Sequence, residues 1–343
     1  MQSKTQGTKP PPPQQTISIS VNPQELANQF KPDNNIDKLK ELQDLRKSKL
    51  VSLYTVGGEL APLHFSFVPA LFEILGAVGK SKKIDLLLRS TGGIAEVPWR
   101  IVSLIREYCD TFCVIVPEIA LSGATHIAIA ADELVLSELS TLGSVDPTRM
   151  HPLLPKDKNQ NPIPISVQDL KHCILFIKEQ LGIKKDIEME EKKDLSNIIA
   201  ELFKHVHPLS VGAIEQSYQL SKLITRKALE TRKEKLNQEH MNKIEKILGE
   251  EYFSHAFPIC RKDVKNDLEL PVIEPSPELK EKMWDLHLYY MKEFNKSKTI
   301  TQQNQPPFQF KYIGFLDTIY TRRALCAIID PNNRPILRSW VTI

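Results

Sequence analysis

The chain has 343 residues, of which 41% are hydrophobic, and its 45 basic and 42 acidic side chains give a formal net charge of +3. This length and apolar content suit one large domain with appendages, or two domains, with a sizeable core. The balanced charge argues against a nucleic-acid-binding protein or one held on an anionic membrane. The five cysteines are odd in number and lack metal-like spacing, so they indicate neither a metal site nor a disulfide framework.

The first segment, residues 1–33, is polar and rich in Gln, Thr and Pro, with a run of prolines at 10–13. It lacks the apolar stretch of a signal peptide. The longest apolar run of the chain, residues 65–78, is interrupted by Glu73 and is too short to span a bilayer. We therefore expect a disordered tail over 1–33, no transmembrane segment, and a cytoplasmic protein whose cysteines stay reduced.

Strands and helices are expected to alternate after this tail. Residues 35–47 carry leucines at helical spacing and predict a short helix that leads into a strand over 50–55. Residues 83–89 (KIDLLLR) predict a second, buried strand, followed by a helix over 95–109. This alternation is typical of a mostly parallel sheet with helices on its outside.

Two consecutive glycines, Gly92 and Gly93, stand directly after the second predicted strand. Glycines at this place let the backbone turn sharply and approach another group closely. Their amides could form an oxyanion hole, which stabilises the tetrahedral intermediate of acyl transfer. An ordinary turn between a strand and a helix would use the same two residues.

Ser122 stands where a third strand ends and a helix begins. Residues 111–116 (TFCVIV) predict that strand, and residues 123–131, nearly all small or apolar, predict a helix buried on all sides. The serine hydroxyl would lie beside the first amides of the helix, which have no partner within it. An anion formed there would be stabilised, which suits a nucleophile. Because serine is also a preferred N-cap, the junction alone leaves both roles open.

Four motifs in this order carry a specific resemblance. They are Arg89-Ser90-Thr91-Gly92-Gly93, Ser122-Gly123-Ala124-Thr125, Ala130-Ala131-Asp132-Glu133 and Leu142-Gly143-Ser144-Val145-Asp146-Pro147. The stretch that contains them resembles the Clp/crotonase superfamily and, within it, the serine dehydrogenase proteinase family, which is related to signal peptide peptidase A and the proteolytic subunit of Clp. The resemblance extends over about residues 45–275, with weaker matches at 207–213 and 253–259.

The resemblance implies a fold, a reaction and site residues. The fold would be α/β, with repeated ββα units around a buried, mostly parallel sheet. The reaction would be peptide-bond cleavage by acyl transfer, with Ser122 as nucleophile and the amides of Gly92, Gly93 and Gly123 as the oxyanion hole. No metal and no organic cofactor would be needed.

The general base is where the chain departs from these relatives. Clp-type relatives carry a histidine about 25 residues after the nucleophile, whereas this chain has Asp146 there and His151 as the nearest histidine. Relatives of the signal-peptide-peptidase type use a lysine about 40 to 55 residues downstream. Here that window contains Lys171, within a predicted amphipathic helix over 166–181, and Lys178 follows it.

Two side chains remain as candidates for this base. Lys171 could serve because a buried lysine beside a hydroxyl can lose its proton near neutral pH, although a solvated helix lysine fits the pattern equally. His207 could serve because imidazole needs little adjustment to act near pH 7, although it could instead cap the helix after Pro208. The residues alone leave the choice open.

The last part of the chain changes character. Residues 215–248 predict one long helix and residues 275–295 another. Strands are expected over 308–316, 324–329 and 336–342, the last two joined by a Pro- and Asn-rich turn. We therefore expect the chain to end in a small β element.

These patterns together predict three parts: the tail over 1–33, a Clp/crotonase-like serine peptidase domain over 34–275, and a helix with a β-hairpin element over 276–343. The partner would be a peptide or protein substrate rather than a nucleic acid. Since the resembled family builds rings or stacks, we expect a homo-oligomer. Two alternatives stay open: a crotonase-like acyl-CoA enzyme, which shares the oxyanion geometry without a serine nucleophile, and a catalytically inactive scaffold, which the missing histidine would explain.

Overall fold

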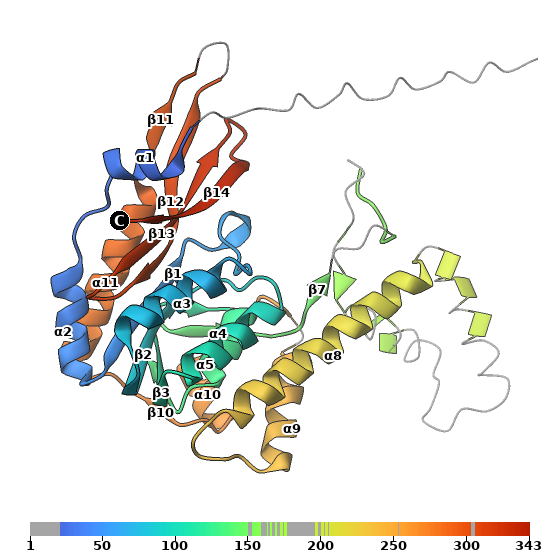
Figure 1. Ribbon diagram of the computed structural model, residues 1–343. Coiled ribbons are helices and arrows are strands. Elements are labelled where there is room, and N and C mark those ends of the chain that lie inside the picture. Colours follow the sequence, from blue (N-terminus) through green and yellow to red (C-terminus); the bar gives the residue numbers. More distant parts are fainter. Residues whose placement is uncertain are drawn as a thin grey trace, which may run out of the picture.

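A nine-stranded sheet forms the centre of the computed structural model (Figure 1). Along its main path the strand order is β10–β5–β3–β2–β1–β12–β13–β14, and β11 pairs with β12 beside this path. The strands of this sheet are β1 (Lys49–Thr55), β2 (Ser81–Arg89), β3 (Cys109–Val116), β5 (Glu133–Leu136), β10 (Val272–Ile273), β11 (Lys298–Ile300), β12 (Phe308–Asp317), β13 (Arg322–Ile329) and β14 (Pro335–Thr342). The structure describes residues 21–149, 153–158, 163, 165–166, 169, 172–173, 175–176, 196–197, 200–201, 203–204, 206–252, 254–302 and 306–343.

The sheet is parallel from β10 to β1 and antiparallel from β1 to β14. Two smaller sheets accompany it. They consist of β4 (Ile119–Ala120), β6 (Thr141–Gly143) and β9 (Pro258–Cys260), and of β7 (Thr148–Arg149) and β8 (Ile165–Ser166).

Helices cover both faces of the main sheet, as an α/β fold requires (Figure 1). One core lies under α3, α4 and α5, and the other under α2 and α11. Strand β2 contributes side chains to both cores, because Ile84 and Leu86 belong to the first core and Leu87 belongs to the second. The helices are α1 (Pro23–Gln29), α2 (Ile36–Arg46), η1 (Gly58–Leu60), α3 (Phe67–Val78), α4 (Glu96–Arg106), α5 (Gly123–Ile129), α8 (Pro208–Glu230), α9 (Gln238–Lys246), η2 (Ile247–Glu251), α10 (Arg261–Asn266) and α11 (Pro277–Asn295).

The expectation of disorder throughout residues 1–33 is wrong for α1. The Asn22 side chain accepts a hydrogen bond from the Gln24 amide at 2.9 Å, and a proline occupies the first helical turn. The Gln24 side chain in turn hydrogen-bonds both backbone groups of Thr342, the residue that ends β14. This partner lies at the far end of the chain, so a local reading of the tail could not find it.

The C-terminal strands are not a separate β element, because they extend the main sheet. Strand β12 pairs antiparallel with β1, so that Ser52 faces Asp317 and Thr55 faces Gly314. The Val56 amide continues this contact by donating to the Ile313 carbonyl at 2.9 Å. The expected hairpin of β13 and β14 is confirmed, but it forms the antiparallel edge of the same sheet.

Two helices differ in length from the expectation. The single helix expected over 215–248 is divided into α8 and α9, because the buried Arg232 turns back to bond the Ile129 carbonyl at 3.1 Å and Asn237 caps a new helix. Helix α4 ends at Arg106 rather than near residue 109, because Cys109 already pairs with β2 as the first residue of β3.

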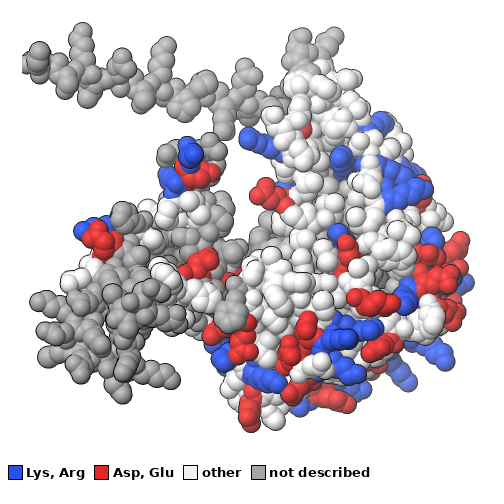
Figure 2. Space-filling model, turned by 180° about the vertical axis from the view of Figure 1, so that it is seen from behind, with Lys and Arg blue, Asp and Glu red and all other residues white. Residues whose placement is uncertain are grey.

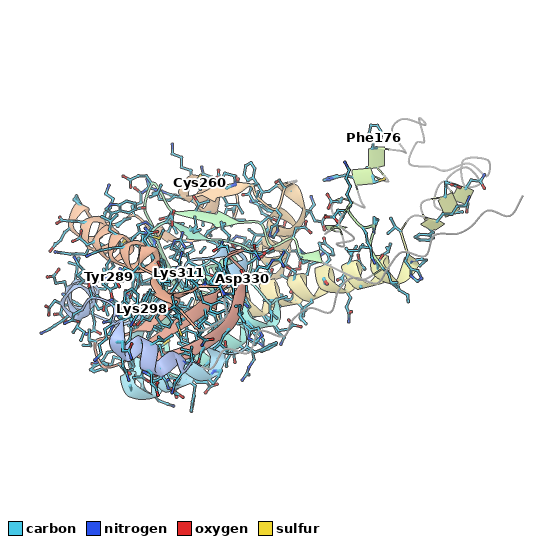
Figure 3. The ribbon with its side chains drawn as sticks, turned by 90° about the horizontal axis from the view of Figure 1, so that it is seen from above. Phe176, Cys260, Tyr289, Lys298, Lys311 and Asp330 are labelled. Carbon is cyan, nitrogen blue, oxygen red and sulfur yellow. The ribbon has the colours of Figure 1, made fainter. Side chains whose placement is uncertain are left out.

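Helix α8 leaves the body of the molecule (Figure 1). Its C-terminal half packs beside α4 and α5, while its N-terminal half extends away from the sheet. Seen from above, Phe176 lies out on this side, far from Tyr289 and Lys298 on the body (Figure 3), and 61% of its surface is exposed. Acidic and basic side chains are interspersed over the face shown in Figure 2, as the small net charge leads one to expect. Among the helices that the structure describes, none combines the length and the apolar character needed to cross a membrane.

Candidate active site

The candidate site lies where two neighbouring strands end. Strand β2 leads into Ser90, and β3 leads through Pro117 into β4 and Ser122. The two exits are hydrogen-bonded to each other, because the Leu121 amide donates to the Ser90 carbonyl at 3.0 Å. Ser90 and Ala120 form a parallel bridge as well. The glycines after β2 and the serine after β3 are thereby brought side by side.

Ser122 has a strained backbone. Its φ of 51° and ψ of −118° lie in a region that residues with a side chain rarely adopt. The residue precedes α5 as its N-cap, but its side chain makes no capping hydrogen bond. The hydroxyl is therefore not committed to the helix, which decides against the capping role that the sequence left open.

Gly92 packs against this serine so closely that no side chain fits. Its φ is +88°, and a Cβ built there would lie 2.8 Å from the Gly123 nitrogen and 2.9 Å from the Ser122 Cβ. The Gly92 amide donates to Ser90 Oγ at 3.1 Å. This position therefore requires glycine for shape, while its N–H group is already used.

The amides of Gly93 and Gly123 are available as hydrogen-bond donors, whereas the Gly92 amide already has an acceptor. The bridge between Gly93 and Leu63 is made by the Gly92 carbonyl and the Ile94 amide, each at 2.8 Å, so it leaves the Gly93 amide out. Gly123 is the first residue of α5, and a first-turn amide has no partner within its helix. A Cβ built on Gly123 would lie 3.6 Å from the Gly93 nitrogen, which places the two glycines next to each other.

Buried hydrogen bonds hold these loops in place. Thr125 Oγ1 lies 2.9 Å from the Ala120 carbonyl and 2.8 Å from the Gly143 carbonyl, so α5 is tied to both β4 and β6. Arg89, the last residue of β2, donates to Glu118 Oε2 and to the Thr55 carbonyl, both at 2.6 Å. The scaffold around Ser122 is thus fixed from the side of the sheet and from the side of the small β4–β6–β9 sheet.

Ser122 opens into a cavity of about 430 Å³. The loops that carry Gly93 and Ser122 form one wall, the start of α4 and the segment after β6 form others, and α8 contributes a further side. Two imidazoles line it, His126 from α5 and His255 from the segment before β9. The residues around the cavity are Gly93, Ile94, Ala95, Glu96, Ser122, Gly123, His126, Val145, Pro147, Ser217, Leu220, Ser221 and His255.

The two histidines differ in exposure and bonding. His126 is 4% exposed, its Nε2 lies 3.0 Å from Thr225 Oγ1, and burial lowers its pKa to about 4. His255 is an exposed residue; desolvation by the surrounding protein lowers its pKa, and a hydrogen bond to the backbone of Asp146 opposes this shift. The sequence singled out 253–259 only as a weak match, so His255 was missed as a cavity residue.

The expected bases lie elsewhere. His207 is the N-cap of α8, where its Nδ1 accepts a hydrogen bond from the Leu209 amide at 3.2 Å. It is not among the residues that line the cavity beside Ser122. Lys171, with Lys178 and His151, lies outside the described residues. Throughout the part of the chain that the structure describes, no cluster of three or more His, Cys, Asp or Glu side chains is suited to a metal ion.

Comparison with known proteins assigns this segment to a family. Residues 70–220, which contain the glycine pair and Ser122, match the model of the ClpP-like SDH-type serine proteinases. This segment belongs to that family. The resemblance seen in the motifs is thereby confirmed, and so is the α/β fold of ClpP-like type.

Two curated proteins that this chain is similar to come from Methanocaldococcus jannaschii. "Uncharacterized protein MJ0137" is 28% identical over 248 residues, which is 70% of this chain and 73% of the relative. "Uncharacterized protein MJ1495" is 27% identical over 160 residues, and this chain spans only 54% of its length. Neither name states an activity.

Solved structures match this chain only in part. ClpP1 from Listeria monocytogenes is 13% identical with a TM-score of 0.35, covering 69% of this chain and 98% of that one. A variant of the 1510-N membrane-bound stomatin-specific protease, solved with a substrate peptide, is 18% identical with a TM-score of 0.26. That match covers 38% of this chain and 58% of the protease.

Proposed function

We propose that this chain is a serine peptidase in which Ser122 is the nucleophile and the amides of Gly93 and Gly123 hold the oxyanion. The observation that carries the proposal is the strained Ser122, whose hydroxyl is free of the helix and faces a cavity beside two available amides. Gly92 contributes shape, because only glycine lets the loop approach the serine. The family of residues 70–220 supports the reaction class.

The proposed reaction begins with attack by Ser122 Oγ on the scissile carbonyl carbon. The hydroxyl proton passes to a general base, and the carbonyl electron pair moves onto oxygen, where the Gly93 and Gly123 amides donate to it. Collapse of this intermediate breaks the C–N bond, and the base returns its proton to the leaving amine. Water then hydrolyses the acyl-enzyme by the same steps. The substrate is a peptide or protein, and we further propose a cytoplasmic homo-oligomer.

The direct test is labelling with a fluorophosphonate, which reacts only with an activated serine. We expect a single adduct, which peptide mass mapping places on Ser122, and no adduct in Ser122→Ala. The matched control is Ser103→Ala, on the same side of the sheet in α4, which should keep wild-type labelling. Intact wild-type protein without any adduct would contradict the proposal. Acyl-CoA binding in that case would favour the crotonase-like alternative, and its absence would favour the scaffold.

A further inference from the structure

Two histidines share the cavity of Ser122, and they differ in burial and in bonding. A general base needs a ring nitrogen with a free lone pair and access to the hydroxyl. His126 is enclosed beneath α8, where its Nε2 lies 3.0 Å from Thr225 Oγ1 and its Nδ1 has no hydrogen-bond partner among the described residues, and burial disfavours the positive charge that a base acquires. It lies four positions after Ser122 on α5 and lines the cavity. These contacts describe a structural histidine.

His255 is an exposed residue that lines the cavity, and a hydrogen bond to the backbone holds its ring. One of its ring nitrogens bonds the backbone of Asp146. A ring nitrogen that donates to a carbonyl carries the proton, so the other nitrogen of a neutral imidazole keeps its lone pair. His255 therefore has a second ring nitrogen that can accept a proton, and the residue lines the cavity that holds the serine.

The segment that orients His255 is rigid. The Asp146 amide donates to Ser144 Oγ at 3.2 Å, and Ser144 Oγ donates to the Leu248 carbonyl at 2.7 Å. The Val145 carbonyl accepts from Ser221 Oγ at 2.7 Å, which ties the same segment to α8. The backbone of Asp146 thus has a set position relative to α8 and η2, as an orienting group requires.

We infer that His255 is the general base for Ser122 and that the backbone carbonyl of Asp146 is its orienting partner. The inference rests on the serine peptidase function proposed above. It assigns the base to a segment far from those that the resemblance pointed to. Neither Lys171 nor His207 is then required for proton transfer.

The step balances within these groups. As Ser122 Oγ bonds to the carbonyl carbon, its proton moves to the free ring nitrogen of His255 and the imidazole becomes a cation. The ring N–H on the other side keeps its bond to Asp146. When the C–N bond breaks, the same proton passes to the amine nitrogen and His255 is neutral again.

Burial keeps His255 in the form that accepts a proton. The other titratable side chains that line the same cavity are Glu96 at the start of α4 and His126 on α5, and the backbone of Asp146 bonds the ring of His255. Burial lowers the pKa of His255 below its ordinary 6.5, and the bond to Asp146 limits the fall. The imidazole is therefore neutral near pH 7 and can act as a base there.

The experiment compares fluorophosphonate labelling rates of Ser122 in the full chain across pH. We expect His255→Gln to slow labelling by about 10²- to 10⁴-fold. In the wild type the rate should rise with pH through an apparent pKa below 6.5 and then level off, and this step should vanish in the variant. His207→Gln is the matched control, because it makes the same change at an exposed helix cap, and it should keep the wild-type rate and profile. Free imidazole should restore labelling in His255→Ala, which a merely structural loss would not allow.

The outcomes separate the base from the nucleophile. Equal labelling of Ser122 in His255→Gln and the wild type would overturn the assignment of the base and leave the serine peptidase intact. Loss of labelling in Lys171→Met, with His255→Gln unaffected, would also overturn it and make the lysine the base. Absence of labelling in the wild type at every pH would overturn both proposals. If His255→Gln unfolds at the same temperature as the wild type, its slower labelling reflects loss of the base and not loss of the fold.

Discussion

Gly92 and Ser122 are in such close contact that a methyl group on the first would lie 2.9 Å from the Cβ of the second. The same added carbon would lie 2.9 Å from the Leu121 carbonyl oxygen. Backbone rather than flexible side chain forms most of this contact, so a substitution there cannot be absorbed by a change of rotamer.

Gly92→Ala should therefore abolish labelling of Ser122 and lower the free energy of unfolding by about 2 to 4 kcal/mol, from the steric contact and the positive φ together. The measurements are fluorophosphonate labelling and urea unfolding. Gly76→Ala is the matched control, because Gly76 lies in α3 and a Cβ there meets nothing within 4 Å. It should raise stability by about 0.5 to 1 kcal/mol. Equal stability of the two alanine variants would contradict the described packing of the glycine.

The strain at Ser122 predicts an order of stability among its variants. Ser122→Ala keeps the unfavourable φ and should change the free energy of unfolding by less than about 1 kcal/mol, since no capping bond is lost. Ser122→Gly relieves the strain and should be more stable than Ser122→Ala by about 1 kcal/mol. Both should lack peptidase activity. Denaturant unfolding gives the comparison, and a less stable glycine variant would show that the serine backbone is relaxed.

Arg89 should stabilise the end of β2, from which the glycine loop of the site begins. Arg89→Met removes the donor to the Thr55 carbonyl and the partner of Glu118, and should cost about 2 to 4 kcal/mol of stability. Because Arg89 precedes Ser90, labelling of Ser122 should slow as well. A double-mutant cycle with Glu118→Gln measures the pair, with an expected coupling of about 1 kcal/mol or more. Lys204→Met, which breaks an exposed pair with Glu201, is the control and should change stability by less than about 0.5 kcal/mol.

His126 predicts how stability depends on pH. Burial lowers its pKa from 6.5 to about 4, so the folded chain holds the neutral ring where the unfolded chain binds a proton. Its contribution is complete above about pH 6.5 and is lost as the pH falls toward 4, by up to about 3 kcal/mol. Urea unfolding over this range should show a slope that His126→Gln flattens and His207→Gln, at an exposed cap, retains. A slope unchanged in His126→Gln would show that other groups cause it.

The proposed homo-oligomer can be examined by sedimentation of the full chain at micromolar concentration. We expect a mass above the 39.1 kDa of one chain, with weak activity when dilution separates the copies. Leu209, at the start of α8, is 66% exposed and is the side chain to vary. Leu209→Lys should shift the distribution toward single chains if the free half of α8 takes part. A monomer with full activity would contradict the oligomer.

The sequence predicted the parts of the site that depend on neighbours along the chain. These parts are Gly92, Gly93 and Ser122, which follow the ends of strands, so that the pattern of neighbouring residues is enough to place them. The bounds of the parallel strands β1, β2 and β3 also lie within one or two residues of those expected. His255 could not be found in this way. The role that we propose for it depends on how the segment after η2 packs against Asp146, which no spacing from Ser122 encodes.

The same distinction explains the errors in the fold. Residues 23–29 form α1 because Gln24 meets the end of β14, and the C-terminal strands join the sheet because β12 meets β1. Both contacts link distant segments, whereas periodicity and capping signals report only on nearby ones. Local signals also could not show that Arg232 would divide the expected long helix.

The pairing of β1 with β12 has a consequence for biosynthesis. Strand β1 leaves the ribosome among the first elements, but its antiparallel neighbour, Phe308–Asp317, is translated near the end. Until then β1 has an unpaired edge, although its parallel partner β2 is available. Closing so long a loop is entropically costly and slows folding. A nascent chain that already carries Gly92, Gly93 and Ser122 must still wait for its last strands before the sheet beneath these loops is complete.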